Sequence, residues 1–536
     1  MVRIYLQDAC LRHKFIRDRD ASNVFERPER LRAVNIGIAA AYARLEAAAL
    51  NISMASGRTN AKISPPFVFV RSAKSIRILE HDAARYIHGG AGTEDSPTMH
   101  SYGASLEAWC LDSAETIAKG QSEIPPNFEQ DLYLSPESMS AFEGALGTVC
   151  EAVDDVMTSR PIYSAPNRGT QLDGRAFVVV RPPGHHCSED TPMGFGFVNN
   201  VAVGAVHASK EHGIRRVVIF DYDLHHGNGT QTIVRNINER LNANGVRASA
   251  LDPLIFYGSI HDILSYPCED GDPDLVDDAS LSLSGVNGNW IENIHLQAYA
   301  SEAQFWEYYH RLYSRLFSSA TRFIENTGGA ALDDVLVFIS SGFDASEYET
   351  EDMSRHERKV PTAFYHRFTR DACKFAGKYA AGRIISVLEG GYSDRALTSG
   401  ALAHVTALAD VDGITDQDWW DSKRLAQLEK ATKRRRGRPA RSDKLGSWLR
   451  RTVEIFKVLD TPTGENTSEV IRVPDLADDV KQAMQEEMRQ TSLKRKQTNP
   501  GPQTRAKRSK TAIDPKRVHL GAPTDERESS DDDDAR

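Results

Sequence analysis

The segment VVIFDYDLHHGNGTQ, residues 217–231, places acidic and imidazole side chains directly after an apolar run. If the chain is extended there, Asp221, Asp223 and His225 project to one side, because alternate residues of a strand share a face. Two ionised carboxylates at the end of a buried strand would repel each other and lose solvation unless a cation lay between them. The spacing therefore favours a metal site in which Asp223 and His225 bind one ion.

A third ligand must come from a distant part of the chain. The segment SSGFDAS, residues 340–346, supplies Asp344 just past another apolar run. Two carboxylates and one imidazole leave an open coordination position, as a catalytic metal site requires. Zinc suits this ligand set, and iron(II) would suit it too. The alternative is that these aspartates only form turns or cap helices.

Two further segments carry groups that could assist such an ion. A dication with two carboxylates and a neutral imidazole is formally neutral, so it should activate water less strongly than one held by three imidazoles. In RPPGHH, residues 181–186, two prolines and a glycine favour a sharp turn, and His185 and His186 could act on one water as base and as acid or electrostatic partner. In LEGGYS, residues 388–393, Tyr392 could donate to a developing oxyanion. Exposed loop histidines and a tyrosine packed at a strand end are the simpler alternatives.

The elements that position these groups are apolar, β-branched runs, each ending at polar or glycine residues. They are residues 176–180, 217–220, 254–261, 334–345 and 383–392. Runs without polar alternation indicate burial on both faces, and their alternation with helical segments indicates parallel strands. Ligands of open α/β sheets bind beyond the carboxyl ends of the strands, where every polar cluster lies here. We expect an α/β fold with a large, mainly parallel sheet flanked by helices on both faces. Residues 1–50 read as mostly helical.

Composition bounds the class of protein. The 536 residues are 40% hydrophobic and 26% charged, which is typical of a soluble globular chain. The six cysteines form no CxxC pair, which indicates a reducing compartment and argues against a disulfide framework. We find no apolar run of membrane-spanning length and no signal-peptide core at the start, and therefore expect no membrane association.

Charge is unevenly distributed along the chain. Residues 421–536 hold 27 Lys and Arg against 20 Asp and Glu, a net of +7, whereas the remainder has a net of −17. We expect a basic linker with one short helix over residues 416–460 and a largely disordered tail with an acidic end over residues 461–536. Such a tail suits an anionic partner or a transport receptor.

Two basic motifs in this part of the chain suggest partners. KRRRGRPAR, residues 433–441, contains an Arg-Gly-Arg-Pro core that resembles an AT-hook, which binds the narrow minor groove of A·T-rich DNA. A nuclear import signal or plain solvated charge is the alternative. KRK at 494–496 and AKRSK at 506–510 resemble a bipartite signal read by a nuclear import receptor. We therefore expect the protein in the nucleus, or in both nucleus and cytoplasm.

Seven segments in order resemble the zinc-dependent histone deacetylase family, in its class II-like, fungal Hos-type branch. They are ERPERLRAV, RPPGHH, GFGFVNN, DYDLHHGNGTQ, GSIH, SSGFDA and LEGGY, and the resemblance covers roughly residues 10–410. It implies the arginase/deacetylase fold, with a catalytic domain over residues 1–415. It also implies hydrolysis of acetyl-lysine on histones or other nuclear proteins, and so transcriptional repression and chromatin regulation. An acetylpolyamine or other acyl-amine hydrolase and an inactive chromatin scaffold are the alternatives, and an oligomer is compatible with all three.

The resemblance also implies roles for individual residues. Zinc would be held by Asp223, His225 and Asp344, His185 and His186 would be the acid–base pair, and Tyr392 would be the oxyanion donor. Asp221 would orient His185 and, with Ser259 and Ile260, bind a structural potassium ion, and Asn228 would partner His186, where class I members carry an aspartate. Gly194 and Phe195 would form one wall of the acyl-lysine tunnel, and Asp131 would hold the substrate backbone at its rim. The opposite wall is Tyr266, where many relatives have phenylalanine, so the mouth should be slightly narrower and carry an extra hydroxyl.

Overall fold

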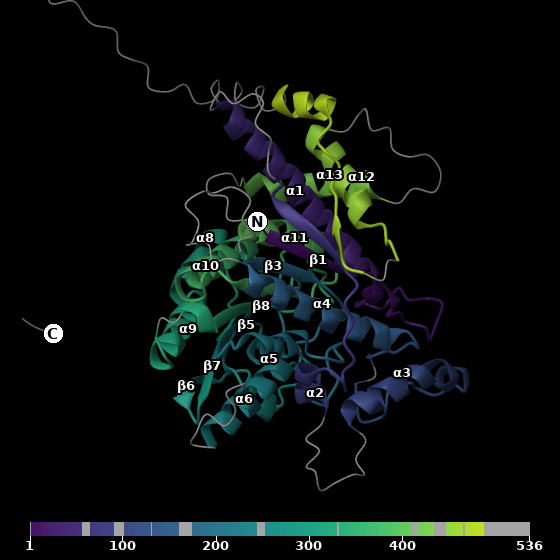
Figure 1. The fold of residues 1–536 in the computed structure, drawn as a ribbon, viewed down its shortest axis with the longest axis vertical. Coiled ribbons are helices and arrows are strands. Elements are labelled where there is room, and N and C mark those ends of the chain that lie inside the picture. Colours follow the sequence, from purple (N-terminus) through teal and green to yellow (C-terminus); the bar gives the residue numbers. More distant parts are fainter. Residues whose placement is uncertain are drawn as a thin grey trace, which may run out of the picture. The chain divides into compact units, whose positions relative to one another are not determined.

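The structure, a computed structural model, describes most of the chain up to residue 486. The described residues are 2–55, 65–89, 101–129, 131–159, 174–243, 252–329, 332–409, 415, 417–433, 446–464 and 467–486. They belong to one compact unit, Met1–Glu487 (Figure 1). The basic motif at 433–441, except for its first residue, and the paired clusters at 494–510 lie outside the described residues, so they stay predictions.

One sheet organises the described residues. Its ten strands lie in the order β10-β2-β1-β3-β9-β8-β4-β5-β7-β6. They are β1 Val2–Gln7, β2 Phe67–Ser72, β3 Arg175–Val179, β4 Arg216–Asp221, β5 Leu254–His261, β6 Ser282–Val286, β7 Asn289–His295, β8 Val335–Ser341, β9 Ile384–Leu388 and β10 Glu469–Ile471. All neighbouring pairs are parallel except the edge pairs of β10 with β2 and of β6 with β7. The predicted mainly parallel α/β sheet is therefore confirmed.

Helices cover both faces of this sheet (Figure 1). They are α1 Glu29–Ala55, α2 Asp82–His88, α3 Tyr102–Ala118, α4 Ser138–Thr158, α5 Asn200–His212, α6 Asn228–Ala243, α7 Pro273–Asp278, α8 Glu302–Tyr308, α9 Arg315–Asn326, α10 Ala363–Tyr379, α11 Asp394–Leu408, α12 Ser422–Thr432 and α13 Ser447–Leu459. Helices α4, α5 and α6 pack on one face, and α9 and α10 pack on the other. Helix α11 packs against α10 and α1, and its His404 ring lies 5.0 Å from that of Phe177 on β3, so it covers the sheet on that second side.

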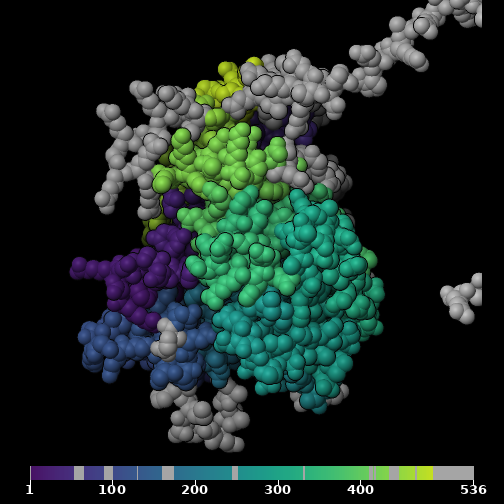
Figure 2. Space-filling model, turned by 180° about the vertical axis from the view of Figure 1, so that it is seen from behind, coloured from purple at the N-terminus to yellow at the C-terminus, as the bar shows by residue number. Residues whose placement is uncertain are grey.

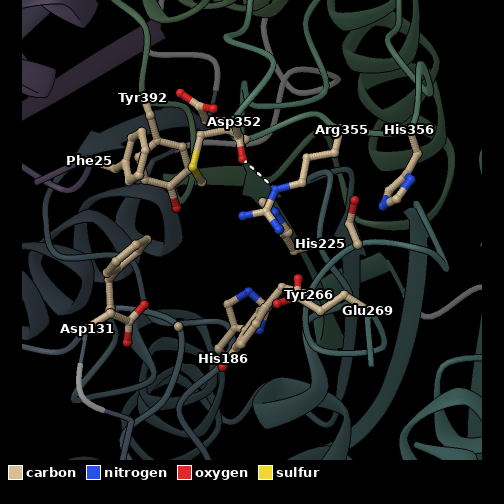
Figure 3. Close-up of a pocket in the computed structure, with 14 residues that line it drawn as sticks. Phe25, Asp131, His186, His225, Tyr266, Glu269, Asp352, Arg355, His356 and Tyr392 are labelled. Atoms are coloured by element: carbon tan, nitrogen blue, oxygen red, sulfur yellow. Dashed lines mark hydrogen bonds between the residues drawn. The ribbon is translucent and has the colours of Figure 1, made fainter. Parts of the chain in front are cut away.

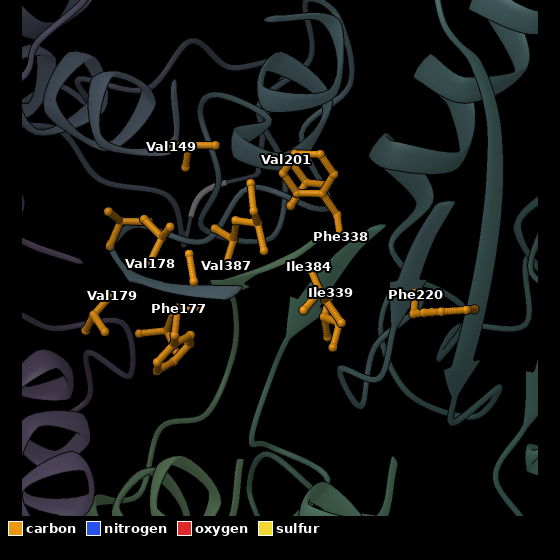
Figure 4. Packing of buried hydrophobic residues seen from close by; sticks show 14 of the residues in the cluster. Val149, Phe177, Val178, Val179, Val201, Phe220, Phe338, Ile339, Ile384 and Val387 are labelled. Atoms are coloured by element: carbon orange, nitrogen blue, oxygen red, sulfur yellow. The ribbon is translucent and has the colours of Figure 1, made fainter. Parts of the chain in front are cut away.

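Strand β3 shows why the central strands lack polar alternation. Val178 points to the side of the sheet that holds Val149 of α4 and Val201 of α5, whereas Phe177 and Val179 point to the opposite side (Figure 4). All three β3 side chains are at most 1% exposed. Burial on both faces favours an unbroken apolar run. The five strands expected from such runs are confirmed as β3, β4, β5, β8 and β9.

The first fifty residues are less helical than the sequence predicts. Residues 2–7 form β1, which lies between β2 and β3 inside the sheet. Its polar side chains are satisfied by distant partners: Arg3 donates to the carbonyl of Asp155 at 2.9 Å, and Gln7 donates to Thr148 at 3.0 Å. Because these partners come from α4, a local reading of six residues could not identify the strand.

Helix α1 is long and apolar enough, by length and composition, to cross a membrane, although the sequence analysis finds no such run. Its apolar window, within residues 29–53, is 83% buried in the protein. The helix packs against α11 and α13. Core helices of soluble proteins have the same composition, so this feature is weak evidence for a membrane span.

Residues beyond the predicted boundary at 415 belong to the same compact unit. Helix α13 packs on α1, where Arg451 forms an ion pair with Glu46 at 2.8 Å and Arg44 lies 3.7 Å over the ring of Trp448. Strand β10 extends the sheet at β2. The predicted linker over residues 416–460 and the start of the predicted tail therefore contain structural elements. Their buried apolar residues lie where α13 meets α1 and where α12 meets α11 and α13.

The segment between β1 and α1 lies against residues about a hundred positions further along the chain. In the view from behind, the purple N-terminal segment adjoins the blue segment (Figure 2). Arg17 forms an ion pair with Glu123 at 2.9 Å, and Tyr133 donates to the carbonyl of Glu26 at 2.8 Å. These two contacts position the chain segment between β1 and α1, part of which lies at the candidate site.

Candidate active site

The three predicted metal ligands meet at the carboxyl edge of the sheet. Asp223 and His225 follow β4, and Asp344 follows the neighbouring strand β8. His225 Nδ1 lies 3.1 Å from Asp223 Oδ1 and 3.0 Å from Asp344 Oδ2. One donor atom of each residue lies within 4.8 Å of the others, and all three residues are buried. Parallel strands end at the same edge, which explains why ligands distant in sequence converge.

Glycine residues make room for the two carboxylates. Asp223 Oδ2 accepts the backbone N–H of Gly390 at 2.8 Å, and Asp344 Oδ1 accepts that of Leu224 at 2.8 Å. A Cβ atom at Gly390 would overlap the Oδ2 atoms of both aspartates, and one at Gly342 would overlap Asp223. The backbone therefore lies in direct contact with both carboxylates. The other oxygen of each, Asp223 Oδ1 and Asp344 Oδ2, faces His225 Nδ1.

This donor set fits a zinc ion. Burial, and then the charge of Asp223, raise the pKa of Asp344, so two adjacent carboxylates are electrostatically costly at this position. A dication between them would remove that cost. Two carboxylates with one imidazole nitrogen are ligands that zinc accepts while keeping an open position. Asp223, His225 and Asp344 are thus a coherent candidate metal centre.

The histidine pair lies beside this centre, and its two members have different partners. The ring centroids of His185 and His186 are 4.0 Å apart. His185 Nδ1 lies 3.1 Å from Asp221 Oδ2, and His186 Nδ1 lies 2.8 Å from Asn228 Oδ1. A carboxylate therefore faces one ring and an amide carbonyl faces the other, as the sequence predicts. Since an amide oxygen only accepts, His186 Nδ1 carries the proton and its Nε2 keeps a lone pair.

These partners separate the pKa values of the two histidines. Burial alone would lower the pKa of His185, but Asp223 and Asp221 outweigh it and raise the pKa to about 10. Burial, followed by repulsion from His185 and His225, lowers the pKa of His186 well below its usual range. The arrangement thus favours a cationic His185 beside a neutral His186, which is a proton acceptor.

Glu389, which the sequence analysis does not single out, holds the loop that carries this pair. Its Oε2 accepts the backbone N–H groups of Gly184 at 2.7 Å and of His185 at 3.2 Å. Burial raises the pKa of Glu389 to about 7, against the opposing effect of His185. The residue belongs to the same LEGGY segment as Tyr392, so one turn after β9 positions two parts of the site.

Tyr392 is anchored by its backbone. Glu349 accepts the N–H of Tyr392 at 2.8 Å and that of Ser393 at 2.9 Å. Arg30 donates to the carbonyl of Gly391 at 2.6 Å, and its guanidinium lies 5.0 Å from the centroid of the Tyr392 ring. Burial raises the pKa of Tyr392 well above its usual range, so the phenol keeps its proton.

A second buried network supports Arg30. Arg30 forms an ion pair with Glu26 at 2.9 Å, and Arg181 donates to the other carboxylate oxygen of Glu26. All three side chains are 0% exposed. Glu26 and Arg30 lie in ERPERLRAV, and Arg181 lies in RPPGHH, two of the segments that carry the family resemblance. In the sequence, an acid in ERPERLRAV and an arginine in RPPGHH are the signal for this buried network.

A pocket leads from the surface to the candidate metal centre (Figure 3). It is lined by Phe25, Asp131, His186, Gly194, Phe195, His225, Ser265, Tyr266, Glu269, Asp352, Met353, Arg355, His356 and Tyr392. The predicted wall residues Gly194, Phe195 and Tyr266 and the predicted rim residue Asp131 are all in this lining. Phe25 and the loop over residues 352–356 complete it, and the sequence analysis does not single them out.

Glu129 is a further residue that sequence reasoning missed. It accepts the hydroxyl of Tyr266 and, at 3.0 Å, the backbone N–H of Gly194. The ring of Tyr266 in turn lies 4.9 Å from that of His186, nearly perpendicular to it. One carboxylate therefore bridges the two predicted walls of the tunnel.

The predicted potassium ligands lie at the ends of neighbouring strands. Asp221 of β4 is directly opposite Ser259 of β5, and Ile260 follows. Asp221 Oδ2 also accepts the hydroxyl of Tyr257 at 3.0 Å, and Ser259 Oγ lies 2.9 Å from His261 Nδ1. These contacts do not test a potassium ion, which stays a prediction.

Known proteins show similarity over most of this unit. The family model of the histone deacetylase domain matches residues 78–408. Histone deacetylase HOS3 of Saccharomyces cerevisiae is 32% identical over 449 residues, covering 79% of this chain and 58% of that protein. Type-2 histone deacetylase 2 of Dictyostelium discoideum is 34% identical over 269 residues, covering 49% of this chain and 13% of that protein. The crystal structure of the HDA15 HD domain matches with a TM-score of 0.48 and 20% identity, over 80% of this chain and 93% of that one.

The mostly parallel sheet carries a buried Asp-His-Asp cluster and a histidine pair at its carboxyl edge, an arrangement that suits a metal-dependent hydrolase. The family match gives the family. The chain belongs to the histone deacetylase family. It spans less than two thirds of the length of these two curated relatives.

Proposed function

We propose that the protein is a zinc-dependent lysine deacetylase that hydrolyses the acetamide of N6-acetyl-lysine to acetate and lysine. The observation that carries the proposal is the unequal histidine pair beside the Asp223–His225–Asp344 cluster, at the base of a pocket lined by Phe195 and Tyr266. A neutral base, a cationic neighbour and a phenol at one metal centre suit amide hydrolysis.

Asp223, His225 and Asp344 would hold the zinc ion, which supplies Lewis-acid polarisation of the acetamide carbonyl and of the attacking water. His186 accepts a proton from that water at Nε2, the ring nitrogen that faces away from Asn228. The Asn228 carbonyl keeps the opposite nitrogen protonated, which fixes the tautomer that can act as a base. His185, paired with Asp221, contributes a positive charge as the oxygen–carbon bond forms.

Tyr392 donates its hydroxyl proton as a hydrogen bond to the carbonyl oxygen as negative charge develops there. When the carbon–nitrogen bond breaks, His186 returns its proton to the departing lysine amine. The net reaction consumes one water, which supplies a hydroxyl to the acetyl group and a proton to the amine. Arg30 and Glu349 act on this step only by positioning Tyr392.

The mouth of the pocket supports a basic substrate. Asp131, Glu269 and Asp352 line it, against one arginine, Arg355, whose Nε donates to the carbonyl of Asp352 at 3.0 Å. This excess of carboxylates favours a cationic peptide, such as a lysine-rich histone tail. An acetylpolyamine is also cationic, so the mouth alone does not choose between the two.

The experiment is acetate release from an acetyl-lysine histone peptide by the purified full chain and by Tyr392→Phe. We expect the variant to lose about a hundred- to a thousandfold in kcat, and chelation of the metal to abolish turnover. Acetylspermidine in competition should inhibit the peptide reaction poorly. Equal activity of the two proteins would refute the role of Tyr392, and no turnover by the unmodified chain would favour a scaffold.

We further propose that the protein acts in the nucleus and takes part in chromatin regulation. The support is the pair of basic clusters at 494–496 and 506–510 and the cationic preference of the pocket mouth. Alanine substitution of both clusters should move the protein out of the nucleus, which fluorescence imaging would report. Nuclear retention of that variant would contradict the proposal.

A further inference from the structure

A second cluster of metal-ligating side chains lies away from the candidate active site, where α2, α4 and α5 meet (Figure 1). His81 is the N-cap residue of α2, Cys150 lies on α4, and His207 lies on α5. One donor atom of each lies within 4.8 Å of the others. None of the three has a role in the mechanism proposed above.

His207 is held in an orientation that leaves one ring nitrogen unused. Its Nε2 lies 2.9 Å from Asp154 Oδ1, which also accepts from His212 Nε2 at 2.7 Å. A carboxylate oxygen accepts hydrogen bonds, so the proton of His207 lies on Nε2 and Nδ1 keeps its lone pair.

The other nitrogen, Nδ1 of His207, is buried and has no hydrogen-bond partner. His207 as a whole is 5% exposed. A buried lone pair without a partner is costly, and a bound ion or an ordered water is one explanation for such an atom in a native protein. A carboxylate that fixes the far nitrogen of a histidine while its near nitrogen binds a metal is a common arrangement around metal centres.

We propose that His81, Cys150 and His207 form a second metal site for a borderline-soft divalent ion such as zinc, with Asp154 as the residue that orients His207. One thiolate and two imidazoles are ligands that select such an ion over magnesium or calcium. Donor atoms of a tetrahedral zinc site are about 3.5 Å apart. The cluster, whose donors lie within 4.8 Å of one another, therefore needs only small side-chain shifts to close.

A competing ligand set shares His207 with this one. Asp154, His207 and His212 also place their donor atoms within 4.8 Å of one another. That set would use Nε2 of His207, and Nδ1 would stay buried without a partner. If His207 binds the ion of the Cys150 set through Nδ1, that buried atom gains a partner and the hydrogen bond between Nε2 and Asp154 is kept. The set with Cys150 is therefore the one that we propose.

Binding would also change the state of the cysteine. Burial raises the pKa of the Cys150 thiol, so without a metal the residue is a neutral thiol. Coordination replaces the S–H proton by the ion and releases that proton to solvent. The site would then join three helices, including α5, whose N-cap Asn199 follows the pocket-wall segment with Gly194 and Phe195.

Cobalt(II) distinguishes this site from the candidate active site, because only a thiolate ligand gives an intense sulfur-to-cobalt charge-transfer band in the near ultraviolet. The full chain is stripped with chelator, loaded with cobalt(II), and compared with Cys150→Ala and Asp344→Ala. We expect the band in the unmodified chain and in Asp344→Ala, and its loss in Cys150→Ala. Absence of the band from the loaded, folded unmodified chain would overturn the proposal, whatever the outcome for deacetylation.

His81→Ala serves if Cys150→Ala does not fold, because His81 is partly exposed at a helix end. It should weaken cobalt binding at the thiolate site at least tenfold, whereas His212→Ala, a matched change on the same surface, should keep the band. Loss of the band in His212→Ala with retention in His81→Ala would contradict the ligand set. Acetyl-lysine hydrolysis should persist in Cys150→Ala, so failure of this proposal and failure of the proposed function are separable.

Discussion

Tyr266 donates its hydroxyl to Glu129, and the same carboxylate accepts the backbone N–H of Gly194 at 3.0 Å. This contact joins the two sides of the pocket through a residue that belongs to neither wall. A phenylalanine at position 266 would keep the ring that packs on His186 but could not hold Glu129. The hydroxyl therefore sets the geometry of the tunnel rather than only its width.

Tyr266→Phe should raise KM for an acetyl-lysine peptide by roughly three- to tenfold with little change in kcat. This is about 0.6–1.4 kcal/mol, less than the about 1.5–3 kcal/mol of a full hydrogen bond to a charged group, because the bond acts on the wall and not on the reacting atoms. Steady-state kinetics would measure it. Tyr309→Phe, which removes a hydroxyl bonded to Asp371 at 2.8 Å outside the pocket, is the matched control. An unchanged KM for Tyr266→Phe would refute the bridging role.

Glu349→Gln should lower kcat by about tenfold or more while leaving zinc binding intact. Glu349 accepts the N–H groups of Tyr392 and Ser393, and a glutamine would turn an NH₂ group toward one of these donors. Each lost hydrogen bond to a charged group is worth about 1.5–3 kcal/mol. Turnover under substrate saturation is the measurement, with Glu351→Gln on the exposed neighbouring turn as control. Equal losses in both variants would exclude a specific effect on Tyr392.

Asn228→Asp should shift the acidic limb of the pH profile of kcat/KM to higher pH, by about one unit or more. Burial, with repulsion from His185 and His225, now lowers the pKa of His186, and a carboxylate next to Nδ1 would raise it. Neutral His186 is the active base. A higher pKa therefore keeps His186 protonated and inactive up to a higher pH. Asn236→Asp, elsewhere on α6, adds the same charge and should leave the limb in place. A limb that stays or moves downward would contradict the assignment of His186 as base.

Glu26→Gln should destabilise the fold by about 3–5 kcal/mol at neutral pH, because it leaves Arg30 and Arg181 buried without their anion. Burial alone would raise the pKa of Glu26, but Arg181 and then Arg30 outweigh it and lower the pKa from 4.5 to about 2. The stability that the carboxylate contributes is therefore complete above pH 4.5 and is lost as the pH falls towards 2. Urea unfolding at a series of pH values should show this loss in the unmodified chain and not in the variant. Parallel acid dependence of the two proteins would contradict the account.

The sequence predicts those strands and site residues that can be recognised from their immediate neighbours in the chain. Strands β4 and β8 are unbroken apolar runs because both of their faces are buried, and Asp223 and Asp344 stand out because they follow such runs directly. The parts that it missed depend on partners far along the chain. Glu129 lies in a proline-containing segment that resembles an ordinary loop, and only the fold brings it to Tyr266. Strand β10 is three residues long, and only the open edge of β2 makes it a strand.

The central claim is that Asp223, His225 and Asp344 hold one zinc ion on which hydrolysis depends. Elemental analysis of Asp344→Ala beside the unmodified chain, after identical zinc loading and with circular dichroism to verify the fold, tests this most directly. The account predicts one equivalent less zinc in the variant, together with loss of acetyl-lysine hydrolysis. Equal zinc content in the two folded proteins, with hydrolysis retained, would contradict it.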